Sequence, residues 1–260
     1  MKSITRKSLL YRSDVEYSNF CLNHVKGCSH GCTFPCYAFN MAKRIGRVKS
    51  YQEWREPKLV ENALELLDKE IPKYKGKIDF VHLCFMTDPF MFQQPEVIDM
   101  SLKIIAKLNS NGIKCTTLTK GVYPVELTDS DRFGRDNEHG ITLVSLDEDF
   151  RKRFEPFTAP YLERVNGLRR LHEAGLKTWI SIEPYPTPNI INQDLEKILQ
   201  EIGFTNKIIF GRLNYNPLVS QFAGADEFYD RCWNVVENFC KSRNIDSHLM
   251  RRKERKKSKS

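Results

Sequence analysis

Residues 27 to 38 read GCSHGCTFPCYA, and this stretch decides how the rest of the chain is interpreted. Cys28, Cys32 and Cys36 lie within nine residues. Iron–sulfur clusters are held by thiolates, and short spacings allow one loop to reach several corners of a cluster. Gly27 and Gly31 permit the positive φ angles and the close backbone approach that such a loop needs. We therefore predict that the three cysteines bind a [4Fe–4S] cluster and leave its fourth iron open.

Zinc is the main alternative occupant of this loop, because three cysteines and one histidine form a common structural zinc site. His30 would supply the fourth ligand from within the loop, or Cys21 and His24 would supply ligands from upstream. Structural zinc sites usually join two cysteine-bearing loops, however, and the remaining sequence offers no matching second loop. Three unligated, reduced cysteines are the remaining possibility, which their close spacing disfavours.

Length and composition indicate one soluble domain with a sizeable core. The chain has 260 residues, of which 40% are hydrophobic and 28% are charged. Its sequence has no apolar run near the roughly 18 residues that a membrane span requires, and its basic N-terminus lacks the apolar core of a signal peptide. Eight cysteines in this length indicate reduced thiols rather than a disulfide scaffold. We therefore expect a cytoplasmic protein with no membrane partner.

The formal net charge of +8 is concentrated at the C-terminus. The last ten residues, RRKERKKSKS, hold seven Lys or Arg and one Glu. Because the last ten residues include no apolar side chain, we expect a basic, disordered tail, which we place at residues 246–260, after a core domain with a short N-terminal extension at residues 1–245. Such a tail would bind the phosphates of a nucleic acid, or would only keep the chain in solution.

Strand-like apolar runs alternate with amphipathic helical patterns along the chain. The runs are short and nearly continuous in apolar character, as expected for parallel strands buried on both faces. They are residues 16–24, 78–85, 114–118, 140–145, 178–182 and 207–210. The helical patterns are residues 57–69, 95–111, 160–174, 192–202 and 226–242, and Pro57, Pro95 and Pro160 stand at plausible first turns.

The alternation of strands and helices predicts an α/β fold with a parallel sheet. A full eight-stranded barrel usually needs about 200–250 residues or more, so six strand–helix units fit this length better as an open structure. We therefore predict a partial (β/α)6 TIM-like barrel.

Polar residues follow the expected strands at the points where these end. The cysteine loop follows the first strand, Thr87 and Asp88 follow the second, Lys120 follows the third, and Ser145 ends the fourth. Because chemistry in parallel α/β sheets gathers at the carboxyl ends of the strands, we expect these residues to face the cysteines. Each also has a structural explanation. Lys120 would then be a surface lysine, Ser145 a helix cap, and Thr87 with Asp88 part of a turn.

The cysteine loop and several later motifs together resemble the radical S-adenosylmethionine (SAM) superfamily, in particular its spore photoproduct lyase-like branch. Members of that branch carry GC-x-HGC-x-YCYA, which is similar to residues 27–38. The chain differs in having three residues between Cys32 and Cys36 instead of two, with Pro35 inserted. Further resemblances follow in the same order: Thr87-Asp88-Pro89, Thr119-Lys120, and Arg153-Phe154-Glu155-Pro156 followed by Arg164 and Leu168–Gly175.

This resemblance implies an enzyme that binds SAM at the open iron of the cluster. Reductive cleavage of SAM would form a 5′-deoxyadenosyl radical that acts on an unidentified substrate, for which a nucleic acid is one option, in a lyase or oxidoreductase reaction. By the same resemblance Lys120 contacts the methionyl carboxylate of SAM, and Ser145 contacts its ribose or carboxylate. Thr87 and Asp88 are placed near its amino group. Tyr37, beside the last cysteine, is expected to line the same site.

The resemblance also implies partners. The cluster must receive an electron, so a reductant such as flavodoxin or ferredoxin is expected. The basic tail adds nucleic acid as a second expected partner. The alternative from another functional class is a zinc-stabilised nucleic-acid-binding protein that uses the tail and performs no radical chemistry.

Overall fold

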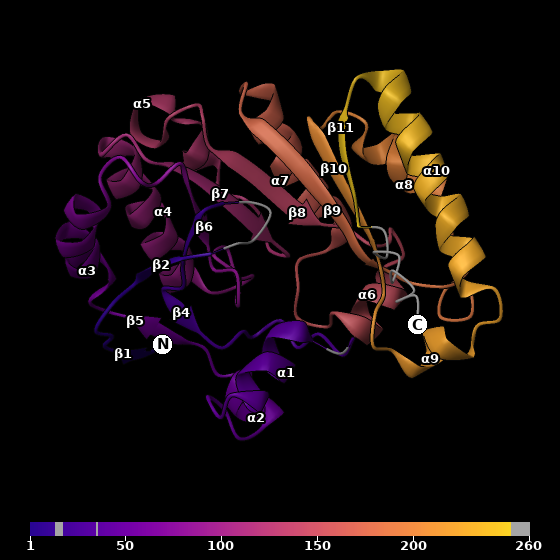
Figure 1. The fold of residues 1–260 in the computed structure, drawn as a ribbon, viewed down its shortest axis with the longest axis horizontal. Coiled ribbons are helices and arrows are strands. Elements are labelled where there is room, and N and C mark those ends of the chain that lie inside the picture. Colours follow the sequence, from indigo (N-terminus) through magenta and orange to yellow (C-terminus); the bar gives the residue numbers. More distant parts are fainter. Residues whose placement is uncertain (14–17, 35, 251–260) are drawn as a thin grey trace, which may run out of the picture.

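The computed structural model describes residues 1–13, 18–34 and 36–250. Its centre is an eight-stranded sheet with the order β11-β10-β9-β8-β7-β6-β3-β2 (Figure 1). All neighbouring strands are parallel except β2 and β3, which are antiparallel. The strands are β2 (Leu10–Arg12), β3 (Phe20–Leu22), β6 (Phe80–Leu83), β7 (Lys114–Thr119), β8 (Glu138–Thr142), β9 (Lys177–Tyr185), β10 (Lys207–Arg212) and β11 (Asp246–Met250).

The predicted α/β fold with a mostly parallel sheet is confirmed. Each of the predicted strand-like runs overlaps one of the parallel strands β3 and β6 to β10, although residues 16–17 of the first run lie outside the described residues. The pairing order begins at β11 and ends at β2, so the sheet is open rather than a closed barrel. The carboxyl ends of the parallel strands therefore share one edge, and the cysteine loop begins near that edge.

The expected boundary between core and tail requires a correction. Residues 246–250 were assigned to the tail, but they form β11, which pairs in parallel with β10 from Lys207↔Asp246 to Gly211↔Met250. The backbone hydrogen bonds of an edge strand do not depend on apolar side chains, and much of β11 is exposed. The rest of the expected tail, residues 251–260, lies outside the described residues.

A small second sheet, with the order β1-β5-β4, corrects another expectation. Residues 57–69 were predicted as one helix, but β5 (Lys58–Val60) occupies its start and α3 (Ala63–Glu70) only its remainder. β5 pairs in parallel with β1 (Lys2–Ile4) and antiparallel with β4 (Val25–Lys26). The helical pattern at residues 58–60 does not lead to a helix, because pairing with β1 and β4 satisfies the backbone N–H and C=O groups of β5 instead.

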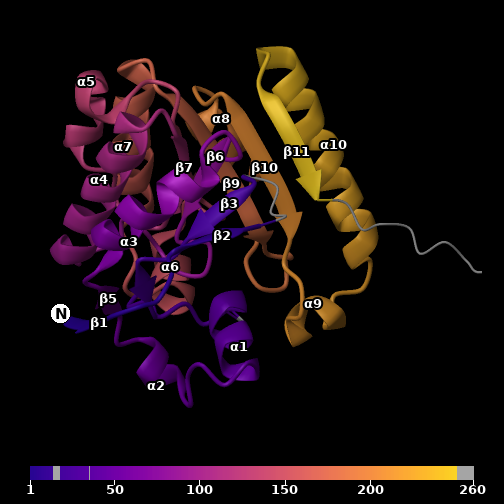
Figure 2. The same cartoon turned by 60° about the vertical axis from the view of Figure 1, so that its left-hand side comes forward.

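The main helices pack along the outer side of the sheet (Figure 2). α4 (Pro95–Ser110) begins at Pro95 as predicted, and α7 (Tyr161–Glu173) follows Pro160, which is its N-cap. α4 contacts β7, α7 contacts β8 and β9, and α10 (Ala225–Arg243) contacts β10 and β11. The other helices are α1 (Tyr37–Arg44), α2 (Tyr51–Trp54), α5 (Ser130–Phe133), α6 (Glu148–Phe154), α8 (Leu195–Ile202) and α9 (Pro217–Gln221), with 3₁₀ turns η1 (Ile71–Tyr74) and η2 (Val125–Thr128).

The largest apolar cluster joins the strands to these outer helices. It includes Val81 of β6, Ile105 of α4, Leu168 of α7 and Phe210 of β10, all fully buried. Cys84, Cys115, Cys232 and Cys240 are buried as well. No helix in the described part of the chain has both the length and the apolar character needed to cross a membrane.

Candidate functional site

The cysteine loop lies between β4 and α1, and Cys36 is the N-cap residue of α1. Cys28, Cys32 and Cys36 are free thiols, and each is partly exposed. Burial raises the pKa of Cys28 well above its ordinary value, and the nearby Asp88 and Cys32 raise it further. Burial also raises the pKa of Cys32, to about 11, against the opposing effect of the Lys120 ammonium. The thiols therefore lie close enough to influence one another, as ligands of one cluster must.

Two glycines fix the shape of this loop. Gly27 has φ +89°, and a Cβ atom there would come within 2.6 Å of the carbonyl oxygen of Trp54. Gly31 has φ +66°, and its Cβ would come within 2.7 Å of the ring of Phe157. Both positions combine a left-handed backbone with a contact that excludes a side chain, so both require glycine. The tight approach at Gly27 allows the Cys28 amide to donate to the Trp54 carbonyl at 2.9 Å.

Segments distant in sequence hold the rest of the loop. The Tyr51 hydroxyl donates to the Cys32 carbonyl at 2.6 Å. The Thr33 amide donates to the Phe154 carbonyl at 2.8 Å, and the Phe157 amide donates to the His30 carbonyl at 3.1 Å. Helix α2, the last residue of α6 and the segment just after α6 therefore all hold the loop through hydrogen bonds.

His30 shapes the loop rather than offering a free ligand. Its Nε2 accepts a hydrogen bond from the Phe92 amide at 3.0 Å, and its Nδ1 lies 3.5 Å from Oδ2 of Asp88. Since Nε2 is an acceptor, the ring proton is on Nδ1 and faces the carboxylate. Burial lowers the pKa of His30 to about 4, so the ring is neutral near pH 7. Both ring nitrogens are engaged, which disfavours His30 as the fourth zinc ligand.

The upstream candidates for a zinc site are also engaged elsewhere. His24 is fully buried, with Nδ1 3.3 Å from Sγ of Cys84 and Nε2 2.9 Å from Oγ of Ser101. Cys21 is buried in β3, where its Sγ lies 3.7 Å from Oγ of Ser18. Across the residues that the structure describes, no three His, Cys, Asp or Glu side chains are close enough to hold a single metal ion. A four-iron cluster differs from zinc here, because its thiolates bind separate irons.

Lys120 follows directly after β7 and points at the cysteine loop. Its Nζ lies 3.7 Å from Sγ of Cys32 and 2.5 Å from Oε1 of Glu155. The other Glu155 oxygen accepts from Nη2 of Arg164 at 2.9 Å, and both of these side chains are fully buried. Burial disfavours ionisation of Glu155, but Lys120 and Arg164 outweigh it and hold its pKa at about 2. Sequence reasoning gave Glu155 and Arg164 no role, and only their place in the resembling motif singled them out.

Asp88 is buried, and protein donors surround its carboxylate. Oδ1 accepts from the Phe90 amide at 2.8 Å and from the Thr119 hydroxyl at 2.6 Å, and Oδ2 accepts from the Lys120 amide at 2.7 Å. The side chain therefore fixes the end of β7, and with it the direction of Lys120.

The other expected cofactor residues lie in different settings. Thr87 is partly exposed, and its hydroxyl reaches the Val25 carbonyl only at 3.5 Å. Tyr37 is 58% exposed, and its ring meets the ring of Phe85 edge-on at 6.5 Å. Thr87 and Tyr37 therefore have polar groups left for a ligand, and both flank the cysteine loop.

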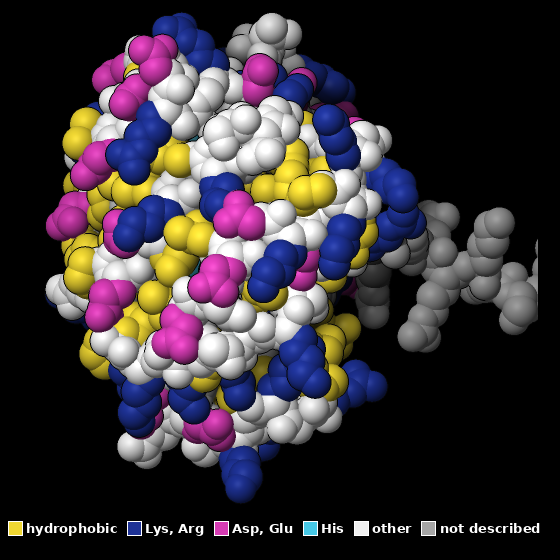
Figure 3. All heavy atoms as spheres, turned by 90° about the vertical axis from the view of Figure 1, so that its left-hand side faces the viewer, with side chains coloured by type: hydrophobic (Ala, Val, Ile, Leu, Met, Phe, Trp, Pro, Cys, Tyr) yellow, Lys and Arg dark blue, Asp and Glu magenta, His cyan; other side chains and the backbone are white. Residues whose placement is uncertain are grey.

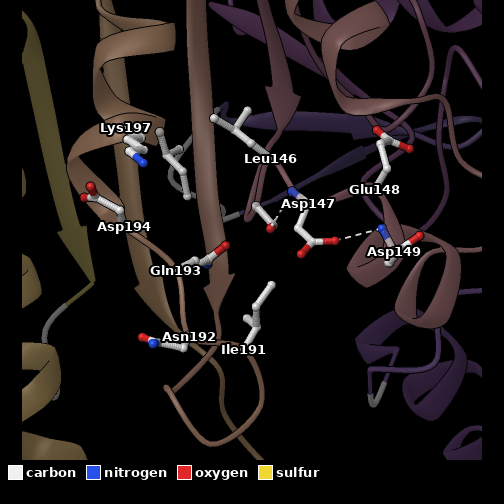
Figure 4. Close-up of a pocket in the computed structure, with 11 residues that line it drawn as sticks. Leu146, Asp147, Glu148, Asp149, Ile191, Asn192, Gln193, Asp194 and Lys197 are labelled. Carbon is white, nitrogen blue, oxygen red and sulfur yellow. Dashed lines mark hydrogen bonds between the residues drawn. The ribbon is translucent and has the colours of Figure 1, made fainter.

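Ser145, which was predicted to end a strand, lies three residues beyond the end of β8; it is fully buried, and its Oγ accepts from the Asp147 amide at 3.0 Å. It lines a pocket of about 390 Å³ between the segments that follow β8 and β9. Figure 4 shows carboxylates around this pocket, among them Asp147 and Asp194. These two aspartates are the N-caps of α6 and α8 and accept hydrogen bonds from the first helical amides. The acidic lining of the pocket is thus explained in part by helix capping.

Two proteins of known sequence align with much of the chain. An uncharacterized protein of Acidianus two-tailed virus is 30% identical over 195 residues, which cover 70% of this chain and 60% of the viral protein. The chain therefore matches less than two thirds of that relative's length. An uncharacterized protein of Methanocaldococcus jannaschii is 26% identical over 239 residues, which cover 90% of this chain and 86% of the archaeal protein.

Solved structures share the fold at low sequence identity. A mutant spore photoproduct lyase with bound AdoMet and dinucleoside spore photoproduct superposes with a TM-score of 0.70 at 12% identity, covering 96% of this chain and 81% of that one. SuiB of Streptococcus suis, bound to S-adenosylmethionine, gives a TM-score of 0.59 at 15% identity, covering 89% of this chain and 50% of that one. The model of the radical SAM superfamily matches residues 22–202, from β3 through α8. This match covers most of the chain, and we conclude that the chain belongs to the radical SAM superfamily.

Proposed function

We propose that Cys28, Cys32 and Cys36 bind the [4Fe–4S] cluster and that the enzyme cleaves SAM reductively at it, to act on a substrate through a hydrogen-atom abstraction. Enzymes of this superfamily use a [4Fe–4S] cluster and SAM, and they need an electron donor. A small reductant such as flavodoxin or ferredoxin fits that need. One observation supports this choice of residues most strongly. Lys120, directly after β7, places its ammonium 3.7 Å from Sγ of Cys32.

The charges around the loop support an anionic occupant. Glu155 is a single carboxylate shared between Lys120 and Arg164, so these three side chains together carry one excess positive charge, which the buried Asp88 carboxylate beside the Lys120 backbone amide offsets in part. An uncompensated buried charge is costly, and a nearby anion offsets this cost. Cluster-bound thiolates and the carboxylate of an amino-acid cofactor are both anions. The donor set and the charge therefore fit the cluster and SAM together.

Each remaining residue has a proposed task. Lys120 has three N–H donors, of which one is directed at Glu155 and one at Sγ of Cys32, so one remains to donate to the methionyl carboxylate. Asp88 positions Lys120 through its backbone amide and does not contact the cofactor itself. Thr87 and Tyr37 flank the cofactor beside the cysteine loop, and Ser145 approaches it from the segment after β8.

When bound, the reduced cluster and SAM would supply a 5′-deoxyadenosyl radical, with methionine as the other product of one-electron cleavage of the S–C5′ bond. The protein supplies binding, orientation and the exclusion of water. His30 is neutral, accepts from the Phe92 amide through Nε2 and has Nδ1 3.5 Å from Asp88, so it keeps the loop in shape without adding a charge beside the thiolates.

Replacing Lys120 by methionine tests this assignment. Met keeps an unbranched stem but removes the ammonium, so the SAM carboxylate loses a charge-assisted hydrogen bond worth about 1.5–3 kcal/mol. We expect the affinity for SAM to fall about ten- to a hundredfold, with iron content preserved. The measurement is equilibrium binding of SAM to the reconstituted protein under anaerobic conditions.

Lys114→Met is the matched control, because Lys114 opens the same strand at its exposed opposite end. It should bind SAM as the unmodified protein does. If Lys120→Met binds SAM within about twofold of the unmodified protein, Lys120 has another task and Thr87 or Ser145 becomes the better candidate. Failure of a fully clustered protein to form 5′-deoxyadenosine from SAM and dithionite would refute the proposed reaction.

A further inference from the structure

A cavity of about 320 Å³ lies beside the cysteine loop, near the carboxyl ends of β3 and β6. Its walls come from the N-terminal segment, from residues around β4, from the α1–α2 region and from the turn after β6. Gly27, which directly precedes Cys28, forms part of one wall, and Thr87 forms part of another. Pockets for small molecules begin at about 300 Å³. The cavity therefore has room for a small ligand next to the proposed reaction site.

Three cationic side chains line this cavity: Arg6, Lys26 and Arg47. None of the described residues that line it is Asp or Glu. Within the described part of the chain, none of the three cations forms an ion pair. Like charges around one cavity repel each other, and a bound anion would relieve this repulsion.

The surface around α1 and α2 is basic as well. Residues 43–49 include four Lys or Arg and no acidic residue. On the face shown in Figure 3, dark-blue side chains gather along the lower edge, the level at which α1 and α2 lie in Figure 1. Such a surface raises the local concentration of an anionic ligand near the cavity.

Arg6 is held in place before any ligand arrives. Asn62 contacts it twice, accepting from the Arg6 amide at 3.1 Å and donating to the Arg6 carbonyl at 2.9 Å. The Arg6 guanidinium donates from Nη1 to the Asn23 carbonyl at 2.9 Å. Asn23 is itself fixed, because its Oδ1 accepts from the Met86 amide at 3.1 Å. A guanidinium has five N–H donors, so four remain available to an anion after the hydrogen bond from Arg6 Nη1 to the Asn23 carbonyl.

We propose that this cavity binds a phosphate group of the substrate, beside the site at which the radical acts. The inference rests on the proposed function and deepens it by naming a substrate class, a small organic phosphate ester. A phosphate near pH 7 carries between one and two negative charges, which suits a site with three cations, and the planar Arg6 fork matches its oxygens. Ile4, Val25 and Met86 line the same cavity and would contact the organic part.

Calorimetric titration of the cluster-loaded protein with phenyl phosphate tests the proposal. We expect the unmodified protein to bind it, and Arg6→Gln and Lys26→Gln each to bind it about ten- to a hundredfold more weakly, because each loses a charge-assisted contact. Lys43→Gln is the matched control, since Lys43 is an exposed lysine of α1 that does not line the cavity. It removes the same charge from the same region and should bind phenyl phosphate within about twofold of the unmodified protein.

Three results would overturn the inference: no binding by the unmodified protein, unchanged affinity in both Arg6→Gln and Lys26→Gln, or an equal loss in Lys43→Gln. Competition between phenyl phosphate and SAM would also overturn it, since the cavity would then belong to the cofactor. Binding is measured without turnover. A protein that binds phenyl phosphate through Arg6 yet forms no 5′-deoxyadenosine would refute the proposed reaction and leave the phosphate site standing.

Discussion

Replacement of Cys32 by alanine is expected to abolish the iron content and the brown colour of the anaerobically reconstituted protein. Cys32 is the middle of the three thiols, and its carbonyl is held by Tyr51 while its sulfur lies beside Lys120. Two remaining thiols cannot hold three corners of a four-iron cluster, so the loss should be nearly complete. The measurement is iron and sulfide per chain, together with the absorbance near about 400 nm that thiolate-to-iron charge transfer produces.

Cys240→Ala is the matched control for this prediction. Cys240 is a buried free thiol of α10, far along the chain from the loop, so its removal takes away a cysteine but no proposed ligand. The control should reconstitute with the iron content of the unmodified protein. Retention of full iron content in Cys32→Ala would show that the cluster has other ligands.

Replacement of Glu155 by leucine is expected to destabilise the protein by about 3–5 kcal/mol. The change leaves two buried cations, Lys120 and Arg164, without the carboxylate that both contact. Removing one partner from a buried ion pair is costly because the other charge stays desolvated. The measurement is the urea midpoint of the anaerobic protein, compared at equal cluster content.

Glu138→Leu is the control, because it also breaks a carboxylate–lysine pair, Glu138–Lys207, whose atoms are 2.8 Å apart. That pair is partly exposed, with 27% and 31% of the two side chains accessible, so its loss should cost only about 0–1 kcal/mol. Equal losses in the two variants would contradict the view that the Glu155 carboxylate neutralises buried charge.

Glu155 also predicts how stability depends on pH. Its pKa in the folded chain is lowered from 4.5 to about 2 by Lys120 and Arg164, against the opposing effect of burial. Between these two values the unfolded chain binds a proton at this residue and the folded chain does not. Acid therefore favours unfolding, and the stability contributed by Glu155 is present above about pH 4.5 and is lost as the pH falls toward 2. The urea midpoint should fall more steeply between about pH 5 and 3 in the unmodified protein than in Glu155→Gln. Parallel curves would contradict this.

The strands that the sequence predicted correctly are those of the main sheet that are buried on both faces. β6 and β10 contain apolar runs, and β7 to β9 are mostly buried although they also carry Thr, Ser, His and Glu residues. β5 and β11 escaped prediction for the opposite reason. Residues 246–250 are largely exposed and lie at the edge of the sheet, and residues 58–60 belong to a small sheet whose partners come from two other parts of the chain. β5 and β11 pair through backbone hydrogen bonds, which the pattern of side chains does not predict.

The same distinction holds at the site. The sequence predicted Cys28, Cys32 and Cys36 as ligands because their spacing is local, and it predicted Lys120 beside them because strand ends share one edge of a parallel sheet. The task of Glu155 depends on a contact with Lys120 across 35 residues of sequence. That contact exists only in the folded chain. The sequence offered His30 as a zinc ligand, but in the folded chain its Nε2 accepts from the Phe92 amide and its Nδ1 lies 3.5 Å from Asp88.

The clamps on the cysteine loop also set an order for maturation of the enzyme. Thr33 bonds through its side chain to the carbonyl of Arg153, which lies 120 residues further along the chain, and Phe157 bonds to His30. During synthesis the three cysteines leave the ribosome long before these partners exist. The loop can form these hydrogen bonds only after residues 153–157 have docked against it. Iron delivered earlier would encounter a loop that has not yet folded. We therefore expect a cluster bound by this loop to be inserted after residues 153–157 have docked against it.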